Sequence, residues 1–219
     1  MSVVGAYRDA MTWNDWLLPR HCVVCRSVGM ALCPRCAASL RPAPEAPPGP
    51  GLDRVVALFA YEGAGRTVIG RLKFDNHRDA LGPLAAMLGA AVDEQVDLVT
   101  WVPTVAARKR RRGYDQAELI ARDVAASLGV PARATVRRLD RVAQTGRGRA
   151  ERLGARFVAR TRLRGEIVAV VDDVRTTGAS LAGVAVALRA AGAGRVIGAT
   201  LAATPGSVPF RPGDPLQSS

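Results

Sequence analysis

The sequence predicts an α/β fold, with a parallel β-sheet flanked by helices and a small cysteine-rich subdomain at the N-terminus. Short apolar runs of strand length alternate with segments of helical periodicity, which is the pattern of a parallel sheet covered by helices. All four cysteines lie near the N-terminus, and a proline-rich stretch follows them. We expect a helix and cysteine subdomain at residues 1–40, a hinge at 41–52, the α/β domain at 53–204 and a disordered tail at 205–219.

The strands of the α/β domain are predicted from four short, mostly apolar runs, at residues 55–61, 98–102, 167–171 and 196–201. Three helices are predicted from apolar residues that recur three and four positions apart, at residues 81–88, 117–128 and 181–188. Gly129 and Gly192 mark the ends of the second and third of these helices, since glycine commonly terminates a helix. The spacing of apolar residues near the N-terminus predicts a short amphipathic helix that ends at Pro19.

The composition excludes some protein classes and favours some partners. Apolar residues make up 48% of the chain, which is enough for a hydrophobic core. The sequence contains no secretion signal and no stretch of about 20 apolar residues, so we expect a cytoplasmic protein without membrane insertion. The 31 basic residues against 19 acidic ones favour anionic partners, although many of these arginines fit an ordinary solvated surface.

The cysteines form two C-x-x-C pairs, and this is the pattern of a metal site. The pairs are Cys22 with Cys25 and Cys33 with Cys36. Two such turns can offer four thiolates to one tetrahedral Zn²⁺ ion, and a closed four-sulfur site has a structural role. Disulfides and a redox C-x-x-C are the alternatives, and a reducing compartment disfavours the first. The sequence therefore predicts structural zinc.

Two acids and a hydroxyl-rich turn follow the third predicted strand. Asp172 and Asp173 come at its carboxyl end, where open α/β sheets bind ligands. The turn then supplies hydroxyls, a glycine and the N-terminus of a helix, which together suit a phosphate group. The alternative is an ordinary N-capping residue, which explains one residue but not the series. The hydroxyls are those of Thr176, Thr177 and Ser180 and the glycine is Gly178, in a segment that runs from Arg175 through Ala179 to Ser180.

This segment resembles the 5-phosphoribosyl-1-pyrophosphate (PRPP) motif of type I phosphoribosyltransferases. Further motifs follow the order seen in the ComF family of competence-associated, phosphoribosyltransferase-like proteins: the four cysteines, Lys73-Phe74, and Arg112-Gly113-Tyr114-Asp115-Gln116. The resemblance implies a type I phosphoribosyltransferase-like fold with a zinc-ribbon-like N-terminal subdomain. It also implies that Asp172 and Asp173 bind the ribose hydroxyls. Asp115 stands where the family usually has Asn.

Basic side chains are predicted to face the pyrophosphate group of such a ligand. Arg108 and Arg112 follow the second predicted strand, and the planar guanidinium suits phosphate oxygens. For the residues between them a solvated charge run is the favoured interpretation. Lys73 is a further candidate as a point charge, and Mg²⁺ would be held largely by ligand oxygens and water. The glycine- and arginine-rich residues 141–152 are predicted to form a lid over the site.

The sequence therefore predicts a protein that binds PRPP with Mg²⁺ and transfers a phosphoribosyl group to an acceptor that it does not identify. By its resemblance to ComF, the protein is expected to act in DNA uptake or nucleotide salvage. The alternative is a non-catalytic sensor of PRPP or a nucleotide, or an accessory factor that binds single-stranded DNA through its basic surface.

Overall fold

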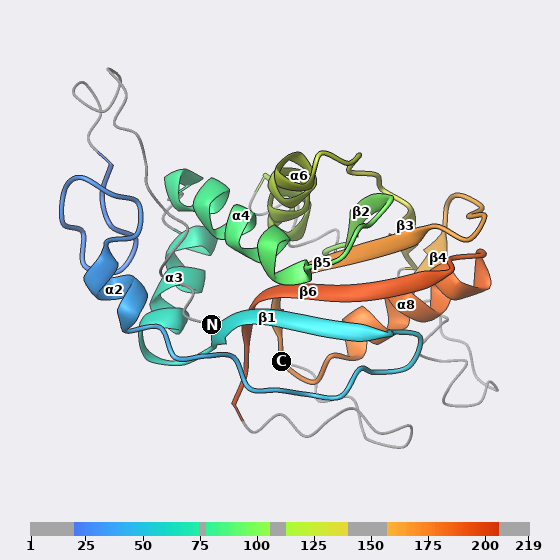
Figure 1. Cartoon of the computed structure of the whole chain (residues 1–219), viewed down its shortest axis with the longest axis horizontal. Coiled ribbons are helices and arrows are strands. Elements are labelled where there is room, and N and C mark those ends of the chain that lie inside the picture. The colour runs from blue at the N-terminus through green and yellow to red at the C-terminus, as the bar shows by residue number, and fades with distance from the viewer. Residues whose placement is uncertain (1–19, 75–77, 106–112, 140–156, 206–219) are drawn as a thin grey trace.

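The computed structural model describes residues 20–74, 78–105, 113–139 and 157–205 (Figure 1). The described residues form a four-stranded, fully parallel sheet in the order β1-β6-β5-β2. This confirms the predicted α/β class. The predicted N-terminal helix, the lid at 141–152 and almost all of the predicted tail lie outside the described residues.

The sheet is built from the four predicted strands, which are β1 (Arg54–Ala60), β2 (Leu98–Trp101), β5 (Ile167–Arg175) and β6 (Arg195–Ala203). Most residues of β5 and β6 are buried, because both strands lie in the centre of the sheet with a layer on each face. The predicted ranges of β5 and β6 were too short at their carboxyl ends. Both strands continue past the purely apolar run, since each pairs with the other as far as Arg175 and Ala203.

One face of the sheet is covered by three helices, α3 (Gly63–Phe74), α4 (Leu81–Val92) and α6 (Gln116–Leu128). A short 3-10 turn, η2 (Arg78–Ala80), precedes α4. Residues of α3, α4 and α6 share one core with alternate residues of the strands, for example Ala169 and Val171 of β5. The sequence pattern predicted α4 and α6 but missed α3, whose three glycines lower its helix propensity.

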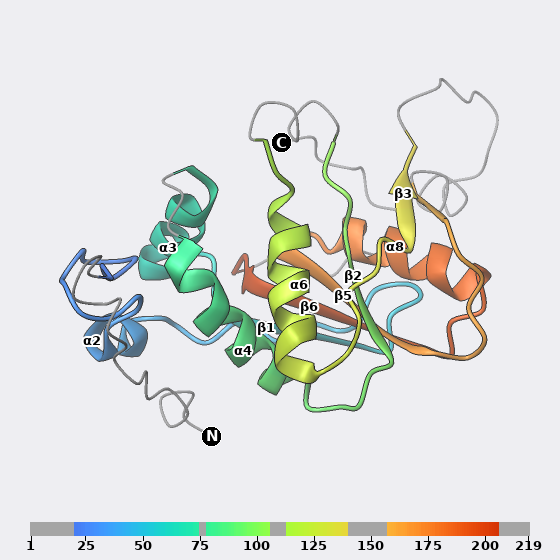
Figure 2. The same ribbon diagram turned by 90° about the horizontal axis from the view of Figure 1, so that it is seen from above.

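The opposite face is covered by α8 (Ala179–Ala190) and by a two-stranded antiparallel ribbon. The ribbon consists of β3 (Val136–Arg138) and β4 (Phe157–Ala159) and was not predicted. Its strands have three residues each, too few for a periodic signal. Figures 1 and 2 show the resulting three layers, with the sheet between α4 and α6 on one side and α8 on the other.

The four-cysteine subdomain, defined here as residues 20–40, includes the short helix α2 (Pro34–Ala38). It lies beside α3 at one end of the sheet (Figure 2). The proline-rich segment that follows it runs along the body of the protein. The amide of Ala60 donates to the carbonyl of Arg41, and Arg189 Nε donates to the carbonyl of Gly51 at 3.2 Å. The segment predicted as a hinge is therefore anchored to the α/β domain at both ends.

None of the described helices is both long and apolar enough to span a membrane.

Candidate functional site

The acid pair lies inside β5 and not in the turn after it. Asp172 pairs with Thr200 of β6 in the parallel ladder, and both acids are half-buried. The amide of Asp173 donates to Oδ1 of Asp172 at 2.9 Å. Adjacent side chains of a strand leave the sheet on opposite faces, but the charge of Asp173 still disfavours ionisation of Asp172, so the pair depends on its surroundings for compensation.

Lys73 supplies part of this compensation. Its ammonium lies 2.7 Å from Oδ2 of Asp173, and each side chain is about one-fifth exposed (20% and 19%). Lys73 is on the last turn of α3, the helix that the sequence pattern missed. The structure thus places Lys73 beside one of the two acids, and its role toward a ligand stays a prediction.

The pKa of Asp172 lies well above its usual range. Burial of the carboxyl group is the main cause, and the neighbouring charge of Asp173 adds to it. The hydrogen bond from the amide of Asp173 and the charge of Lys73 act in the opposite direction, while the charge of Asp115 raises the pKa further. The pair therefore tends to share a single negative charge more readily than two.

The turn after β5 leaves its backbone amides available to a ligand. Thr176 and Thr177 are exposed, and Gly178 has φ of +75° at the N-cap of α8, a conformation that favours glycine. The amide of Ala179 contacts only Thr177 Oγ1, at 3.4 Å. Within the described part of the chain, the amides of Thr177, Gly178 and Ser180 have no hydrogen-bond acceptor. The start of a twelve-residue helix with unpaired amides attracts an anion.

Arg175 differs from its predicted place in this turn. It is the last residue of β5, and only 7% of it is exposed. Its Nη2 donates to the carbonyl of Pro44 at 3.1 Å, and its buried Nε has no partner. The side chain thus connects the proline-rich segment to β5. The exposed part of the predicted phosphate turn begins at Thr176.

A second group of residues lies where the chain leaves β2 and enters α6. The amide of Thr104 donates to Oδ2 of Asp115 at 3.0 Å, which joins the two ends of the intervening loop. The hydroxyl of Tyr114 donates to the carbonyl of Lys73 at 3.2 Å, which ties this loop to α3. Arg108 and Arg112 belong to the loop but lie outside the described residues, as does His77.

Sequence reasoning gave no role to Asp115 and Gln116 beyond their resemblance to a motif. Both are almost fully buried at the start of α6, at 5% and 4% exposure. Oδ1 of Asp115 and both amide atoms of Gln116 are buried and have no hydrogen-bond partner among the residues that the structure describes. Buried polar atoms without partners are rare. A charged residue and an amide residue at the buried start of a helix are the sequence signal from which Asp115 and Gln116 could have been identified.

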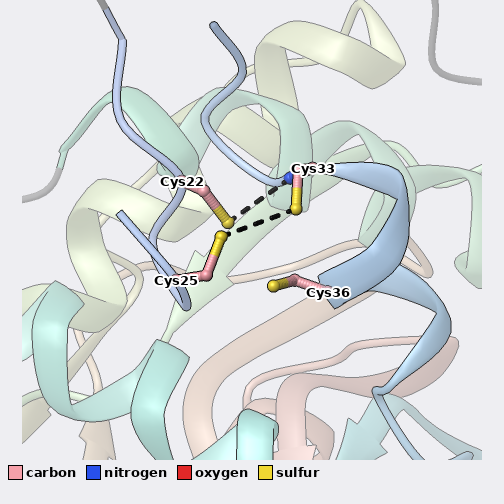
Figure 3. Close-up of side chains that lie close together, drawn as sticks. All are labelled: Cys22, Cys25, Cys33 and Cys36. Atoms are coloured by element: carbon pink, nitrogen blue, oxygen red, sulfur yellow. Dashed lines mark hydrogen bonds between the residues drawn. The ribbon is translucent and has the colours of Figure 1, made fainter. Parts of the chain in front are cut away.

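The four cysteines converge as predicted (Figure 3). Their sulfur atoms all lie within 4.8 Å of one another, and Cys25 Sγ and Cys33 Sγ are 3.7 Å apart. A Zn²⁺ ion with four bonds of about 2.3 Å requires sulfur separations of about 3.8 Å, whereas a disulfide requires about 2.0 Å. The cysteines are free of disulfides. The four-sulfur set therefore fits a tetrahedral zinc ion.

Backbone amides around the cysteines favour the thiolate forms that bind metal. The amides of Val24 and Cys33 each donate to Cys22 Sγ at 3.5 Å. Hydrogen bonds from Ser27 lower the pKa of the Cys25 thiol to about 6. Burial raises the pKa of the Cys36 thiol, which the charge of a bound cation would reverse.

The structure therefore brings together Lys73, Asp173 and Asp172, with the turn at Thr176–Ser180 following directly in the chain. The four cysteines form a separate cluster in their own subdomain.

No protein-family model and no curated protein sequence matches this chain. Among the solved structures that resemble part of it are two that each have a TM-score of 0.43 and 23% identity. One is an allosteric regulatory enzyme of purine biosynthesis, matched over 57% of this chain and 26% of the enzyme. The other is the glutamine PRPP amidotransferase from B. subtilis in complex with ADP and GMP, matched over 56% and 26%. The chain thus corresponds to about a quarter of the length of either protein.

Proposed function

We propose that the site at the end of β5 binds a phosphorylated ribose, with PRPP and Mg²⁺ as the ligand, and that the protein transfers the phosphoribosyl group to an acceptor. The observation that carries the proposal is an acid pair in β5, followed after two intervening residues by an exposed turn with unpaired amides. A sugar phosphate presents hydroxyl donors and a phosphate anion a few bonds apart, and this succession offers acceptors and donors in the same order.

In this proposal the turn at Thr176–Ser180 binds the 5′-phosphate. Its amides and the hydroxyls of Thr176, Thr177 and Ser180 donate hydrogen bonds to the phosphate oxygens. Asp172 and Asp173 accept hydrogen bonds from the ribose 2′- and 3′-hydroxyls. The raised pKa of Asp172 means that one carboxyl group of the pair can also donate a hydrogen bond to a sugar oxygen.

Lys73, Arg108 and Arg112 are proposed to stabilise the leaving pyrophosphate. The C1–O bond breaks with its electron pair on pyrophosphate, and a lone pair of the acceptor, typically a nitrogen, forms the new bond to C1. The proton lost by that nitrogen passes to solvent. Mg²⁺, bound by ligand oxygens and water, would neutralise charge on the pyrophosphate.

The test is calorimetric titration of the protein with PRPP and Mg²⁺. We expect saturable binding by the unaltered protein and loss of at least about tenfold in affinity for Asp173→Asn, since the neutral amide is a weaker acceptor. Equal affinity of the two proteins would contradict the proposal. Release of pyrophosphate with a panel of nitrogen acceptors then distinguishes a transferase from a non-catalytic sensor, which binds PRPP without turnover.

A second candidate, binding of single-stranded DNA, is favoured by arginines on and beside the β3–β4 ribbon. Arg133, Arg137, Arg160 and Arg162 are all exposed there. Arginine-rich surfaces bind phosphodiester backbones with an affinity that falls steeply with salt. This function accords with the role in DNA uptake that the ComF resemblance implies. The test is the affinity for a labelled single-stranded oligonucleotide at roughly 50 and 200 mM salt. An affinity that does not change between these concentrations would exclude this function.

A further inference from the structure

The last turn of α3 contacts three separate parts of the protein. Arg71 contacts the four-cysteine subdomain, Lys73 contacts the acid pair, and the carbonyl of Lys73 accepts from Tyr114 of the β2–α6 loop. These contacts involve residues within one helical turn, which rises by about 5.4 Å. A displacement of this turn would therefore change all three contacts together.

Arg71 holds the backbone of the first C-x-x-C turn. Its Nη1 donates to the carbonyl of Val23 at 2.9 Å and to the carbonyl of Val24 at 3.0 Å. Val23 and Val24 are the two residues between Cys22 and Cys25, so the guanidinium binds the backbone of the metal-binding turn itself.

The four-cysteine subdomain and α3 also share a hydrophobic core. Buried residues of the subdomain belong to the same cluster as buried residues of the helix, and the set comprises Cys22, Val23, Ala31, Leu32, Cys36, Val68, Ile69 and Leu72. Two of the four cysteines are thus part of the core that supports α3. Packed interiors transmit small displacements because they contain few voids.

On its other side the same turn places the ammonium against the acid pair. Lys73 Nζ contacts Asp173 at 2.7 Å, and its position depends on where α3 ends. The carbonyl of Lys73, in turn, accepts from Tyr114, at the end of the loop that carries Arg108 and Arg112. Lys73 and the described end of this loop at Tyr114 therefore both depend on this turn.

We propose that Arg71 is a positioning residue that couples the four-cysteine subdomain to the acid pair, so that metal binding by the cysteines strengthens ligand binding at β5. The inference rests on the proposed function for its ligand. Zinc fixes the C-x-x-C turn, Arg71 holds the end of α3 against that turn, and Lys73 then keeps its place beside Asp173. The two sites are linked, and by reciprocity the ligand strengthens zinc binding to the same degree.

The experiment compares Arg71→Met with Arg66→Met, a matched control on the same helix. Arg66 is exposed, and its guanidinium lies over the ring of Tyr61. We measure the affinity for PRPP with Mg²⁺, the zinc affinity by competition with a chelator, and hydrogen exchange of the amides of residues 68–73. We expect Arg71→Met to weaken both affinities by about tenfold, as for the loss of a charged hydrogen bond, and Arg66→Met to change neither.

A double comparison separates coupling from general destabilisation. Removal of zinc should weaken PRPP binding to the unaltered protein and should have little further effect on Arg71→Met. Equal PRPP affinity of Arg71→Met and the unaltered protein would overturn the inference and leave the proposed function intact. If the unaltered protein does not bind PRPP, the proposed function fails, and hydrogen exchange decides the coupling alone. Zinc should then slow the hydrogen exchange of residues 68–73 in the unaltered protein but not in Arg71→Met. If zinc slows this exchange equally in both proteins, the inference is overturned.

Discussion

The ammonium of Lys73, on the last turn of α3, lies 2.7 Å from Oδ2 of Asp173 in β5. This contact compensates one of two adjacent carboxylates, and it connects the helix that packs on the four-cysteine subdomain with the strand that precedes the exposed turn. A ligand that binds through Asp173 has to share that carboxylate with Lys73. The ion pair is therefore both a stabilising contact and part of the proposed site.

We expect Lys73→Met to lower the free energy of unfolding by about 1 kcal/mol, because it leaves Asp173 half-buried beside Asp172 without a cation. For a chain of this length this corresponds to a decrease of about 2–4 °C in the melting temperature. The measurement is thermal unfolding at pH 7. The double variant Lys73→Met/Asp173→Asn should regain part of the unfolding free energy that Lys73→Met loses. If the effects of the two substitutions on this free energy are strictly additive, the two side chains are not coupled.

Asp172→Asn is expected to raise the melting temperature at pH 7. A raised pKa means that the folded protein holds a proton more tightly than the unfolded chain. The stability from this carboxyl is complete below the ordinary pKa of 3.8 and is lost as the pH rises through the raised value. Asparagine suffers no such loss and can still accept from the amide of Asp173. Each kcal/mol of added unfolding free energy should raise the melting temperature by about 2–4 °C. The difference between Asp172→Asn and the unaltered protein should vanish near pH 3.8.

The control for this measurement is Asp79→Asn, which changes an exposed carboxylate in η2. It should leave the melting temperature unchanged across the same pH range. A melting temperature of Asp172→Asn that is lower than that of the unaltered protein at pH 7 would contradict the account of a strained acid pair. Functional sites often retain such destabilising groups because the ligand requires them.

Substitutions of Asp115 separate its hydrogen bond from its charge. Asp115→Asn keeps an acceptor for the amide of Thr104, whereas Asp115→Ala removes it and should cost about 1 kcal/mol in unfolding free energy. Both changes remove a charge that raises the pKa of Asp172. The midpoint of the pH-dependent stability should therefore move to lower pH in both variants. Identical melting temperatures of the two would refute a role for the Thr104–Asp115 contact.

Gly178→Ala is expected to lower the free energy of unfolding by about 1 kcal/mol, because φ of +75° is unfavourable for a residue with a Cβ atom. The new Cβ would meet nothing closer than 3.9 Å, so the cost comes from the backbone and not from a collision. Gly70→Ala, in the interior of α3 with open space around it, should instead be stabilising by several tenths of a kcal/mol. Chemical denaturation of both variants measures this difference in sign.

The purified protein should contain one zinc ion, released by a strong chelator with a fall in the melting temperature. Cys25→Ser should prevent stoichiometric zinc binding, because it removes the thiolate whose pKa of about 6 makes it a ligand at neutral pH. Metal analysis and thermal unfolding provide the measurements. Recovery of Cys22–Cys25 or Cys33–Cys36 as disulfides in protein purified without reductant, with no zinc present, would contradict the metal site.

Much of the fold could be predicted from periodicity alone. The four strands of the sheet and three of its helices correspond to apolar patterns, because burial on one face of a helix or both faces of a strand selects apolar residues. The pattern missed α3, where Gly65 is required because a Cβ there would collide with the carbonyl oxygen of Ala60. It also ended β5 at the last apolar residue, although the ladder with β6 continues through both acids.

The same distinction holds for the candidate sites. The order of residues was enough to predict the groups that are close along the chain, which are the two acids with the turn that follows them and the two C-x-x-C pairs. Their proximity is local, so spacing is sufficient to predict it. The tertiary structure alone decided that Lys73 pairs with Asp173, that Arg71 holds the metal-binding turn, and that Arg175 is buried against Pro44. Those contacts join distant segments, and they follow from how α3 and the proline-rich segment pack on the sheet, which no local pattern encodes.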